Sequence, residues 1–351
     1  MSVLNSDIDF RGIYRMPNRK EAYSKLSPVT WVPAAKCWFV TDPEAITKIM
    51  KNYELEVINM ADELALLSEA MGTSLTHTDT FLLSTALTQN GERHKKLRKA
   101  VVNTIREKGP MAESAFETEI QNRLSDVFEQ SSEVDLIADV IVPAVRAFVQ
   151  MLADPDPGLV DRASVLIGSF DPYLSLRSRQ KIEEAAAGFF PINPDDPEAK
   201  DRIFRNALGV MANDTMVGSM GIGLYNFFVS QIGKRVDQMP WSQASLAATV
   251  SFTDRIAMET VKYGETTIQK GGRIRFCFGV NDVQNQSDKT MMFGRGHHLC
   301  PGARPAQNCF DIVKREFSKL KLTLANVDMA FSEDGFIAIV PDHLKIRVSH
   351  G

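Results

Sequence analysis

The residues with the clearest chemical potential stand in one short segment, residues 293–302. It places Cys300 in a glycine-rich stretch, with His298 two positions before it and Gly302 two positions after it. The glycines of this segment, Gly294 and Gly302 among them, can take positive φ angles and carry no Cβ, so the backbone can approach a flat, bulky group. Backbone N–H groups that converge on sulfur stabilise the thiolate, the form of cysteine that binds metal. The pattern therefore predicts a thiolate ligand beside a large planar cofactor.

The segment matches the pattern Phe-Gly-x-Gly-x-His-x-Cys-x-Gly at every fixed position and resembles the cysteine-ligand loop of the cytochrome P450 family. The resemblance implies heme b as cofactor, with Cys300 as the axial ligand of its iron. A thiolate in that position pushes electron density onto the iron and favours O–O cleavage. It also implies that His298 faces a heme propionate and that Phe293 packs over the thiolate, with Gly294 and Gly302 close to the ring.

Two other interpretations of this segment stay open. Cys300 can be a free cysteine buried beside a glycine turn, since free cysteines are often buried. Zinc is a second alternative, because its usual ligand types include those of His297, His298, Cys300 and Cys309. Adjacent histidines do not easily converge on one metal, and the chain has no Cys-x-x-Cys pair. Heme is therefore the favoured interpretation.

Two further elements carry cations that suit an acidic cofactor. His94 and Arg98 are four positions apart in a helical pattern, so their side chains project from one face. The resemblance implies that they and Arg255 hold the heme propionates. Without the cysteine segment, a solvated basic helix face would be the favoured interpretation. The basic residues that flank these elements are Arg93, Lys95, Lys96, Lys99 and Arg304. They form either a docking patch for an acidic electron carrier or an ordinary solvated surface.

Residues 211–215 lie inside a long apolar helical pattern and resemble the distal helix of the same family. The resemblance implies that Ala212 lies against the cofactor and that Asp214 and Thr215 manage proton delivery during oxygen activation. An acid and a hydroxyl in mid-helix compete for backbone hydrogen bonds, so a solvent-facing pair is the alternative. Met211 stands where the family usually has glycine or alanine, and we expect it to narrow the cavity or to form a substrate wall. The other expected pocket walls are Phe81, Leu82, Phe336 and Ile337.

The composition is that of an ordinary globular protein, with 351 residues of which 44% are hydrophobic, 24% charged and 8% aromatic. The net charge of −4 favours neither nucleic acid nor a membrane surface as a partner. The four cysteines show no disulfide spacing, and the first residues do not read as a signal peptide. No uninterrupted apolar run approaches the length of about 18 residues that a membrane span requires. We therefore expect a cytoplasmic protein that forms a single domain over residues 1–351.

The hydrophobic pattern is mainly helical and predicts an α+β protein with small β-sheets near its two ends. Helices are expected at about 91–108, 112–130, 134–153, 201–235 and 242–251, beginning at 41–44, and after Cys300. Strands are expected at 37–40, 256–259, 266–268 and 274–280, with a closing hairpin of 336–340 and 344–348.

Compared with the family, the chain is short in two regions. Between Asp214 and Cys300 the family carries a Glu-x-x-Arg helix whose ion pair locks the segment leading to the cysteine, and residues 236–262 contain no such pair. The stretch from 154 to 201, which should hold the lid helices, is short as well. Well-packed apolar residues can replace a buried ion pair at little cost, so we expect a P450 fold truncated in these regions. A short lid fits either a small substrate or an open pocket for a carrier-bound one.

The resemblance implies a heme-thiolate monooxygenase of secondary metabolism. Its partners would be dioxygen, a small-molecule or carrier-bound substrate and a ferredoxin- or flavodoxin-type electron donor. A second hypothesis keeps the heme and changes the reaction to peroxide use, isomerisation, dehydration or N–O or N–N chemistry. A third is a degenerate protein that recruits a biosynthetic enzyme, which the missing Glu-x-x-Arg pair favours and the intact cysteine segment opposes.

Overall fold

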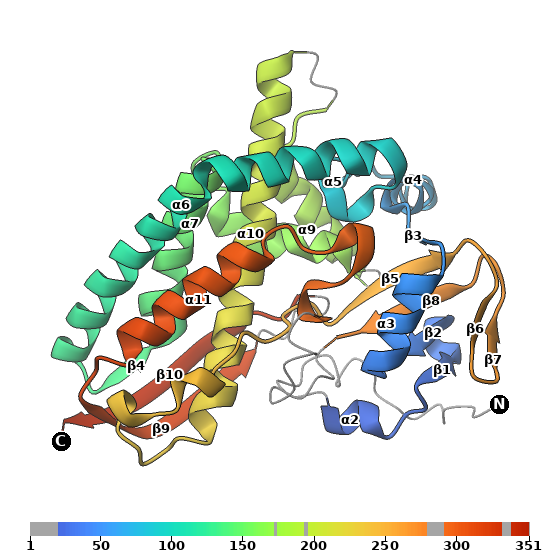
Figure 1. Ribbon diagram of the computed structural model, residues 1–351. Coiled ribbons are helices and arrows are strands. Elements are labelled where there is room, and N and C mark those ends of the chain that lie inside the picture. Colours follow the sequence, from blue (N-terminus) through green and yellow to red (C-terminus); the bar gives the residue numbers. More distant parts are fainter. Residues whose placement is uncertain (1–19, 172–173, 193–195, 279–290, 332–337, 351) are drawn as a thin grey trace.

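The structure, a computed structural model, describes residues 20–171, 174–192, 196–278, 291–331 and 338–350. These residues form a mainly helical protein with a small sheet toward each end of the molecule (Figure 1). This is the α+β architecture that the sequence predicts.

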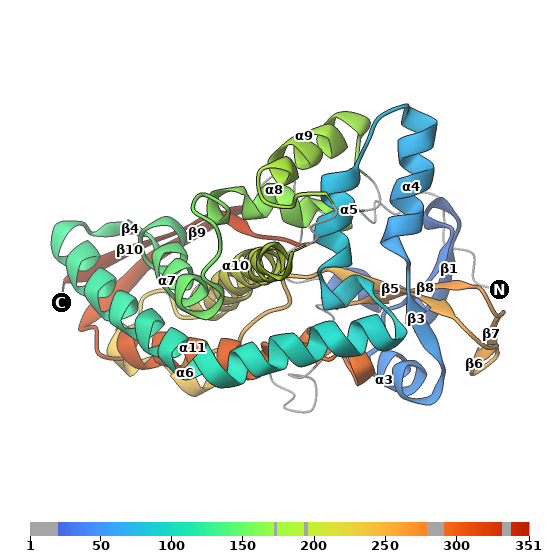
Figure 2. The same cartoon turned by 90° about the horizontal axis from the view of Figure 1, so that it is seen from above.

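Long helices form the body of the molecule, and α10 passes through its middle (Figure 1). Seen from above, α10 lies between the layer that contains α6 and α11 and the pair α8 and α9 (Figure 2). The helices are α2 (Lys20–Ser24), α3 (Pro43–Asn52), α4 (Met60–Met71), α5 (Thr76–Leu83), α6 (Gly91–Gln130), α7 (Val142–Ala153), α8 (Ala163–Ile167), α9 (Leu176–Ala187), α10 (Pro197–Val229) and α11 (Ala303–Phe317).

The larger sheet has the strand order β1-β2-β8-β5-β3, in which β2 and β8 are parallel and the other pairs are antiparallel. Its strands are β1 (Val29–Val32), β2 (Cys37–Val40), β3 (Leu55–Val57), β5 (Phe252–Ala257) and β8 (Arg273–Cys277). The second sheet has the order β4-β10-β9, and β6 pairs with β7 in a separate hairpin. These strands are β4 (Glu133–Asp135), β9 (Leu322–Phe331), β10 (Pro341–His350), β6 (Val261–Tyr263) and β7 (Thr266–Ile268).

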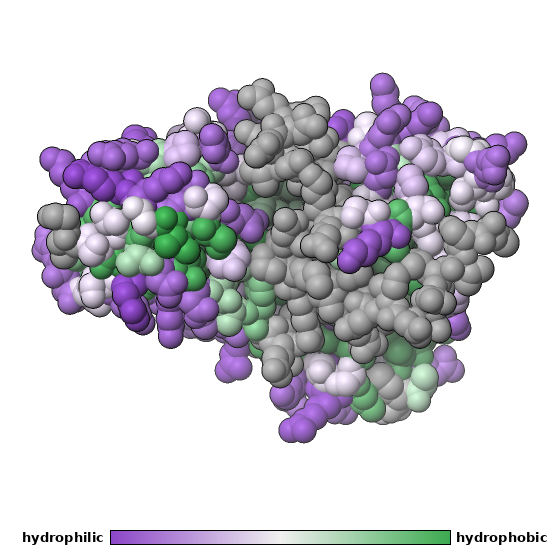
Figure 3. Space-filling view, turned by 90° about the horizontal axis from the view of Figure 1, so that it is seen from below, coloured by the Kyte–Doolittle hydropathy of each residue, from purple (hydrophilic) through white to green (hydrophobic). Residues whose placement is uncertain are grey.

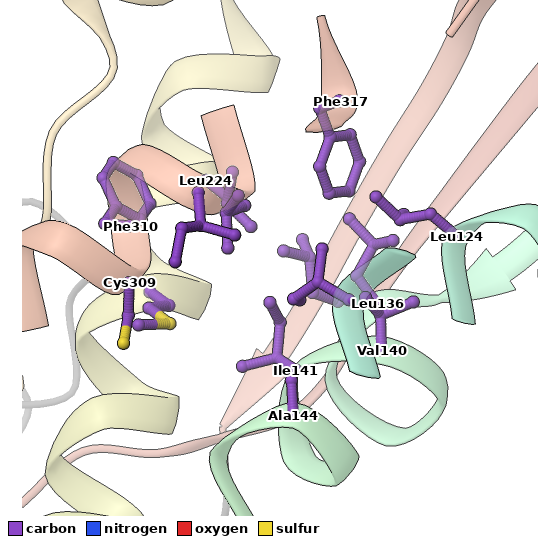
Figure 4. Close-up of a cluster of buried hydrophobic side chains, with 14 of the residues drawn as sticks. Leu124, Leu136, Val140, Ile141, Ala144, Leu224, Cys309, Phe310 and Phe317 are labelled. Atoms are coloured by element: carbon purple, nitrogen blue, oxygen red, sulfur yellow. The ribbon is translucent and has the colours of Figure 1, made fainter. Parts of the chain in front are cut away.

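The main hydrophobic core fills the space between α6, α7, α10 and α11. Leu124, Leu136, Leu224 and Phe310 meet there from four different parts of the chain (Figure 4). Cys309 on α11 is one of these core side chains and is fully buried. Two smaller cores lie against the N-terminal sheet and beneath α5, α8 and α9. The expectation of a single domain stays a prediction.

Several local expectations are confirmed. Residues 37–40 and 266–268 are strands β2 and β7. Helix α3 begins as expected, because the Asp42 side chain accepts a hydrogen bond from the Ala45 N–H at 2.8 Å and Pro43 fits the first turn. A helix also follows Cys300, as α11.

Helix α6 differs from the sequence prediction of two helices, because it runs unbroken past Pro110. A proline inside a helix removes one hydrogen bond and costs about 3 kcal/mol. Beyond it, the apolar residues Ala112, Phe116, Ile120 and Leu124 recur every four positions and are all buried. Their burial against the core outweighs the local cost, because each large apolar side chain contributes about 1.5–3 kcal/mol.

Other boundaries were predicted wrongly. The helix expected at 201–235 is α10, which begins at Pro197 and ends at Val229. The helix expected at 134–153 starts with strand β4 and a π-helical turn at Leu136–Ile141. Residues 242–251 contain only a 3₁₀ turn at their start (Trp241–Gln243) and are otherwise not helical. In the closing sheet, β10 pairs with β9, and in the described part of the expected first strand, residues 338–340, Ala338 forms an isolated bridge with Val250; residues 336 and 337 lie outside the described residues. Strand β5 begins four residues earlier than expected, because Asp254 pairs with cations on β8 that local propensity does not take into account.

One stretch, Leu136–Ala153, has the length and composition of a membrane span, with a mean hydropathy of 1.8, although Asp139, Arg146 and Gln150 interrupt its apolar residues. In the structure 56% of it is buried, and it packs in the main core as α7 and the turn before it. Such a core helix passes the same test as a membrane helix. The face seen from below is mostly hydrophilic where it is described, with a small apolar group toward the end that carries β9 and β10 (Figure 3).

Candidate functional site

A cavity of about 360 Å³ lies between the middle of α10, the start of α6, strand β5 and the segment before α11. Its walls bring together most of the residues singled out in the sequence. These are His94, Arg98, Met211, Ala212, Thr215, Arg255, Phe293, Gly294, His298, Cys300 and Gly302. The residues come from four separate stretches of chain, so the tertiary fold alone assembles them.

The cysteine segment closes into a compact loop. The Cys300 N–H donates to the Phe293 carbonyl at 2.8 Å, and Gly294 and Gly296 have φ angles of +73° and +66°. Only glycine takes such angles without strain. Gly302 differs from expectation, because its φ is −83° and it forms the N-cap of α11. A Cβ there would stand 3.7 Å from the Cys300 sulfur, in ordinary van der Waals contact with it.

Cys300 is exposed, but the surface that it exposes faces the cavity while protein surrounds the sulfur on its other sides. That surrounding protein raises the pKa of the thiol. The N–H groups of Gly302 and Ala303 and the charge of Arg98 act in the opposite direction. Two N–H groups at a helix start therefore point at the sulfur, which is how a protein supports a thiolate once a metal binds it.

Two histidines and two arginines lie beside the cysteine. The rings of His94 and His298 are 4.1 Å apart between centroids, and the Arg98 guanidinium donates to the Leu299 carbonyl at 2.5 Å. Burial, followed by the charge of Arg255, lowers the pKa of His298 to about 3. Burial likewise lowers the pKa of Arg255, which is 6% exposed, to about 10. Burial is the main cause of both shifts, because it disfavours the charged form of each side chain.

No described carboxylate forms an ion pair with Arg98 or Arg255. The carboxylate closest in sequence, Asp254, is occupied by Arg273 and Arg275, each at 2.7 Å. A buried guanidinium without a counter-ion is costly unless a ligand supplies the charge. The site therefore fits a ligand that carries carboxylates at this end and a thiolate-binding metal at Cys300, and heme is such a ligand.

Asp214 and Thr215 are neighbours on α10, but only Thr215 lines the cavity. The Thr215 side chain lines the cavity, and its hydroxyl donates to the Met211 carbonyl at 2.6 Å. Asp214 is outside the cavity lining and is 5% exposed. Its Oδ1 accepts from the Asn213 amide at 2.7 Å, while its Oδ2 has no hydrogen-bond partner among the described residues. Burial raises the pKa of Asp214 to about 6.

The expected substrate walls need correction. Met211 lines the cavity, but Phe81 and Leu82 belong to the small core beneath α5, α8 and α9. There Phe81 contacts Phe190, with ring centroids 5.0 Å apart. Helix α5 turns both of them inward, and the residues that follow it, 84–88, reach the cavity instead. Phe336 and Ile337 lie outside the described residues.

Sequence reasoning missed other lining residues. Phe204 and Leu208 precede Met211 and Thr215 at helical spacing, and all four line the cavity. That spacing was the available signal. For residues 84–88 and Val250 the sequence carries no comparable signal, because they follow turns whose direction depends on tertiary contacts.

The zinc alternative finds no support in the described residues, which contain no group of three or more His, Cys, Asp or Glu side chains able to hold a metal ion. His297 is exposed, whereas Cys309 is fully buried among apolar side chains of the main core (Figure 4).

No family model matches the chain, and no curated protein matches its sequence. Solved structures do match. P450BioI, in complex with an acyl carrier protein ligated to hexadec-9Z-enoic acid, is 15% identical over 97% of this chain and 99% of its own, with a TM-score of 0.75. CalO2 is 13% identical over 100% of both chains, with a TM-score of 0.71. A thermophilic cytochrome P450 from Sulfolobus tokodaii is 19% identical over 94% and 99%, with a TM-score of 0.64. The chain therefore has the cytochrome P450 fold.

Proposed function

We propose that this protein is a heme-thiolate monooxygenase. The observation that carries the proposal is the placement on one cavity, in a cytochrome P450 fold, of Cys300 and two arginines, Arg98 and Arg255, that pair with no carboxylate among the described residues. When bound, heme supplies the oxidising chemistry, and the protein holds the cofactor and orients the substrate. Localisation in the cytoplasm stays a prediction.

In this proposal each part of the cavity wall has a distinct role. Cys300 holds the iron, with the N–H groups at the start of α11 directed at its sulfur. His94, Arg98, Arg255 and His298 hold the two carboxylates. The small residues, Ala212 on one side and Gly294 and Gly302 on the other, leave room for a flat ring. Phe293 covers the sulfur and limits its access to water.

Proton handling falls to Thr215 and Asp214. Thr215 has a hydroxyl at the cavity wall, and Asp214 is next to it in the chain with a pKa of about 6, near neutral pH. An acid whose pKa is close to the working pH can both take up and release a proton. Because Asp214 does not line the cavity, its carboxyl must turn, or act through water, to exchange a proton with Thr215.

The lining also indicates the substrate class. Apart from five charged residues, the walls are apolar or carry only neutral polar groups; the charged ones are Arg98, Asp254, Arg255, Arg273 and Arg295. Phe170, Phe204, Leu208 and Met211 form much of the substrate side. Burying a charge against such walls would be costly, so the part of the substrate that enters is uncharged and largely apolar.

The remaining partners follow from resemblance. The carrier-bound acyl chain of P450BioI and the aurachin RE intermediate bound by P450 RauA support a small or carrier-bound biosynthetic substrate. A ferredoxin- or flavodoxin-type donor would supply electrons for dioxygen. Lys96 and Lys99 on α6 and Arg304 on α11 are exposed and suit an acidic surface of such a donor.

The first test is the carbon monoxide difference spectrum of the dithionite-reduced protein. A band near 450 nm that Cys300→Ser abolishes is expected from thiolate-ligated heme. Absence of heme after expression with heme supplied would refute the proposal and favour a recruitment protein.

One observation favours the alternative of a heme enzyme that uses peroxide or performs a redox-neutral reaction, namely that Asp214 is buried and does not line the cavity. Thr215→Ala separates the two functions. A dioxygen-driven enzyme should release hydrogen peroxide and lose coupling to product, whereas the alternative should keep its turnover.

A further inference from the structure

Asp254 and Arg255 are consecutive residues of strand β5, so their side chains lie on opposite faces of the sheet. Asp254 opposes Arg275 in the antiparallel pair with β8, and its neighbours Thr253 and Arg255 point to the opposite face. The Asp254 carboxylate accepts from Arg275 Nε on Oδ1 and from both arginines on Oδ2, each at 2.7 Å. Asp254 thus pairs with Arg273 and Arg275, and no carboxylate in the described part of the chain forms an ion pair with Arg255.

One nitrogen of the Arg255 guanidinium, Nη1, is nevertheless fixed by two hydrogen bonds within the protein. Its Nη1 donates to Thr253 Oγ1 at 2.5 Å and to the Asp254 carbonyl at 2.7 Å. Within the described part of the chain these are its hydrogen bonds, so Nε and Nη2 keep donors for a ligand. The Thr253 hydroxyl accepts from Arg255, and no described residue accepts the hydrogen of that hydroxyl. Thr253 and Arg255 both line the cavity.

We propose that Thr253 is a positioning residue that fixes the Arg255 guanidinium so that its remaining N–H groups, with the Thr253 hydroxyl, face one carboxylate of the bound cofactor. This inference rests on the proposed function, since it requires an acidic porphyrin in the cavity. Because Nη1 already forms two hydrogen bonds within the protein, the Arg255 side chain loses little further conformational freedom when a carboxylate binds. Its hydrogen bonds to that carboxylate therefore cost less conformational entropy.

Three variants of the full-length holoprotein test this role. Thr253→Val keeps the shape of the side chain and removes its hydroxyl, and Thr253→Ser restores the hydroxyl. Thr267→Val is the matched control, because Thr267 is an exposed threonine on β7 outside the cavity. Each variant is loaded with heme or with heme dimethyl ester, which lacks free carboxylates, and cofactor transfer to excess apomyoglobin is timed.

We expect Thr253→Val to speed loss of heme about tenfold, the effect of one hydrogen bond to a charged group. Loss of the dimethyl ester should change less than twofold, and Thr253→Ser and Thr267→Val should match the wild type for both cofactors. An unchanged rate with heme, or an equal acceleration with both cofactors, would overturn the positioning role while leaving the proposed function intact. A wild-type protein that retains neither cofactor would overturn both.

Discussion

Replacing Asp254 with asparagine should destabilise the protein far more than loss of a surface ion pair does. The side chain of Asp254 is 9% exposed and that of Arg275 is 0% exposed, and Arg275 also stacks on Phe252 with its guanidinium carbon 3.7 Å from the ring centroid. Asparagine keeps the shape of the side chain but not its charge, so the buried Arg275 loses the negative charge that Asp254 places 2.7 Å away. Breaking a buried pair from one side costs about 3–5 kcal/mol.

That loss is a large share of the total, because domains unfold with only about 5–15 kcal/mol. Urea unfolding, followed by far-UV circular dichroism, should show a midpoint lowered by about 1 M or more, given slopes of about 1–3 kcal/mol per molar urea. The matched control is Glu133→Gln, which breaks the exposed pair with Arg347 at 2.8 Å. It should cost at most about 1 kcal/mol.

A double variant separates the charge from the packing. Asp254→Asn combined with Arg275→Met removes both buried charges, and it should recover most of the lost stability because apolar residues replace buried pairs at little cost. If Asp254→Asn costs no more than Glu133→Gln, or if the double variant is no better than the single one, the electrostatic reasoning fails.

Because of the same carboxylate, we expect the free energy of unfolding to fall at acidic pH. Burial by itself raises the pKa of Asp254, but the hydrogen bonds and charges of Arg275 and Arg273 outweigh it, so the pKa lies below its ordinary value. The stability that Asp254 contributes is therefore present above the unfolded pKa and is lost as the pH falls through the folded one. In the Asp254→Asn variant, the free energy of unfolding should depend less on pH across the acidic range, which unfolding curves at several pH values would measure.

Three further outcomes can be measured by urea unfolding. The pKa of Asp214 is raised to about 6, so its stabilising contribution is complete below the unfolded pKa and disappears as the pH rises through 6. Asp214→Asn should thus gain up to about 2–3 kcal/mol over the wild type between pH 4 and pH 7, and equal pH dependence would contradict this. Gly218→Ala should cost about 1–3 kcal/mol, because its Cβ would clash with Thr249, while Gly188→Ala, with open space around it, should not. Glu183→Ala should cost about 1–2 kcal/mol, because this carboxylate accepts from two N–H groups in the first turn of α5. A loss no larger than that of an exposed glutamate would rule out this capping role.

The cysteine segment is the part of the site that could be predicted from the sequence. Its glycines, His298 and Cys300 lie within ten positions of the chain, so local geometry alone brings them together. The spacing of His94 and Arg98 was equally informative, because residues four apart share a helix face wherever the helix is placed.

Tertiary contacts decided the features that local pattern cannot encode. Helix α6 continues through Pro110 only because a buried apolar stripe follows it, and β5 includes Asp254 only because arginines on β8 neutralise it. Pairing of β10 with β9 likewise depends on contacts between distant parts of the chain. That Asp214 does not line the cavity, and that Phe81 lies in the core, follows from how α10 and α5 are rotated. The sequence by itself determined which groups can do chemistry, and packing decided which of them face the cavity, because helix rotation and strand pairing are set by burial over the whole fold.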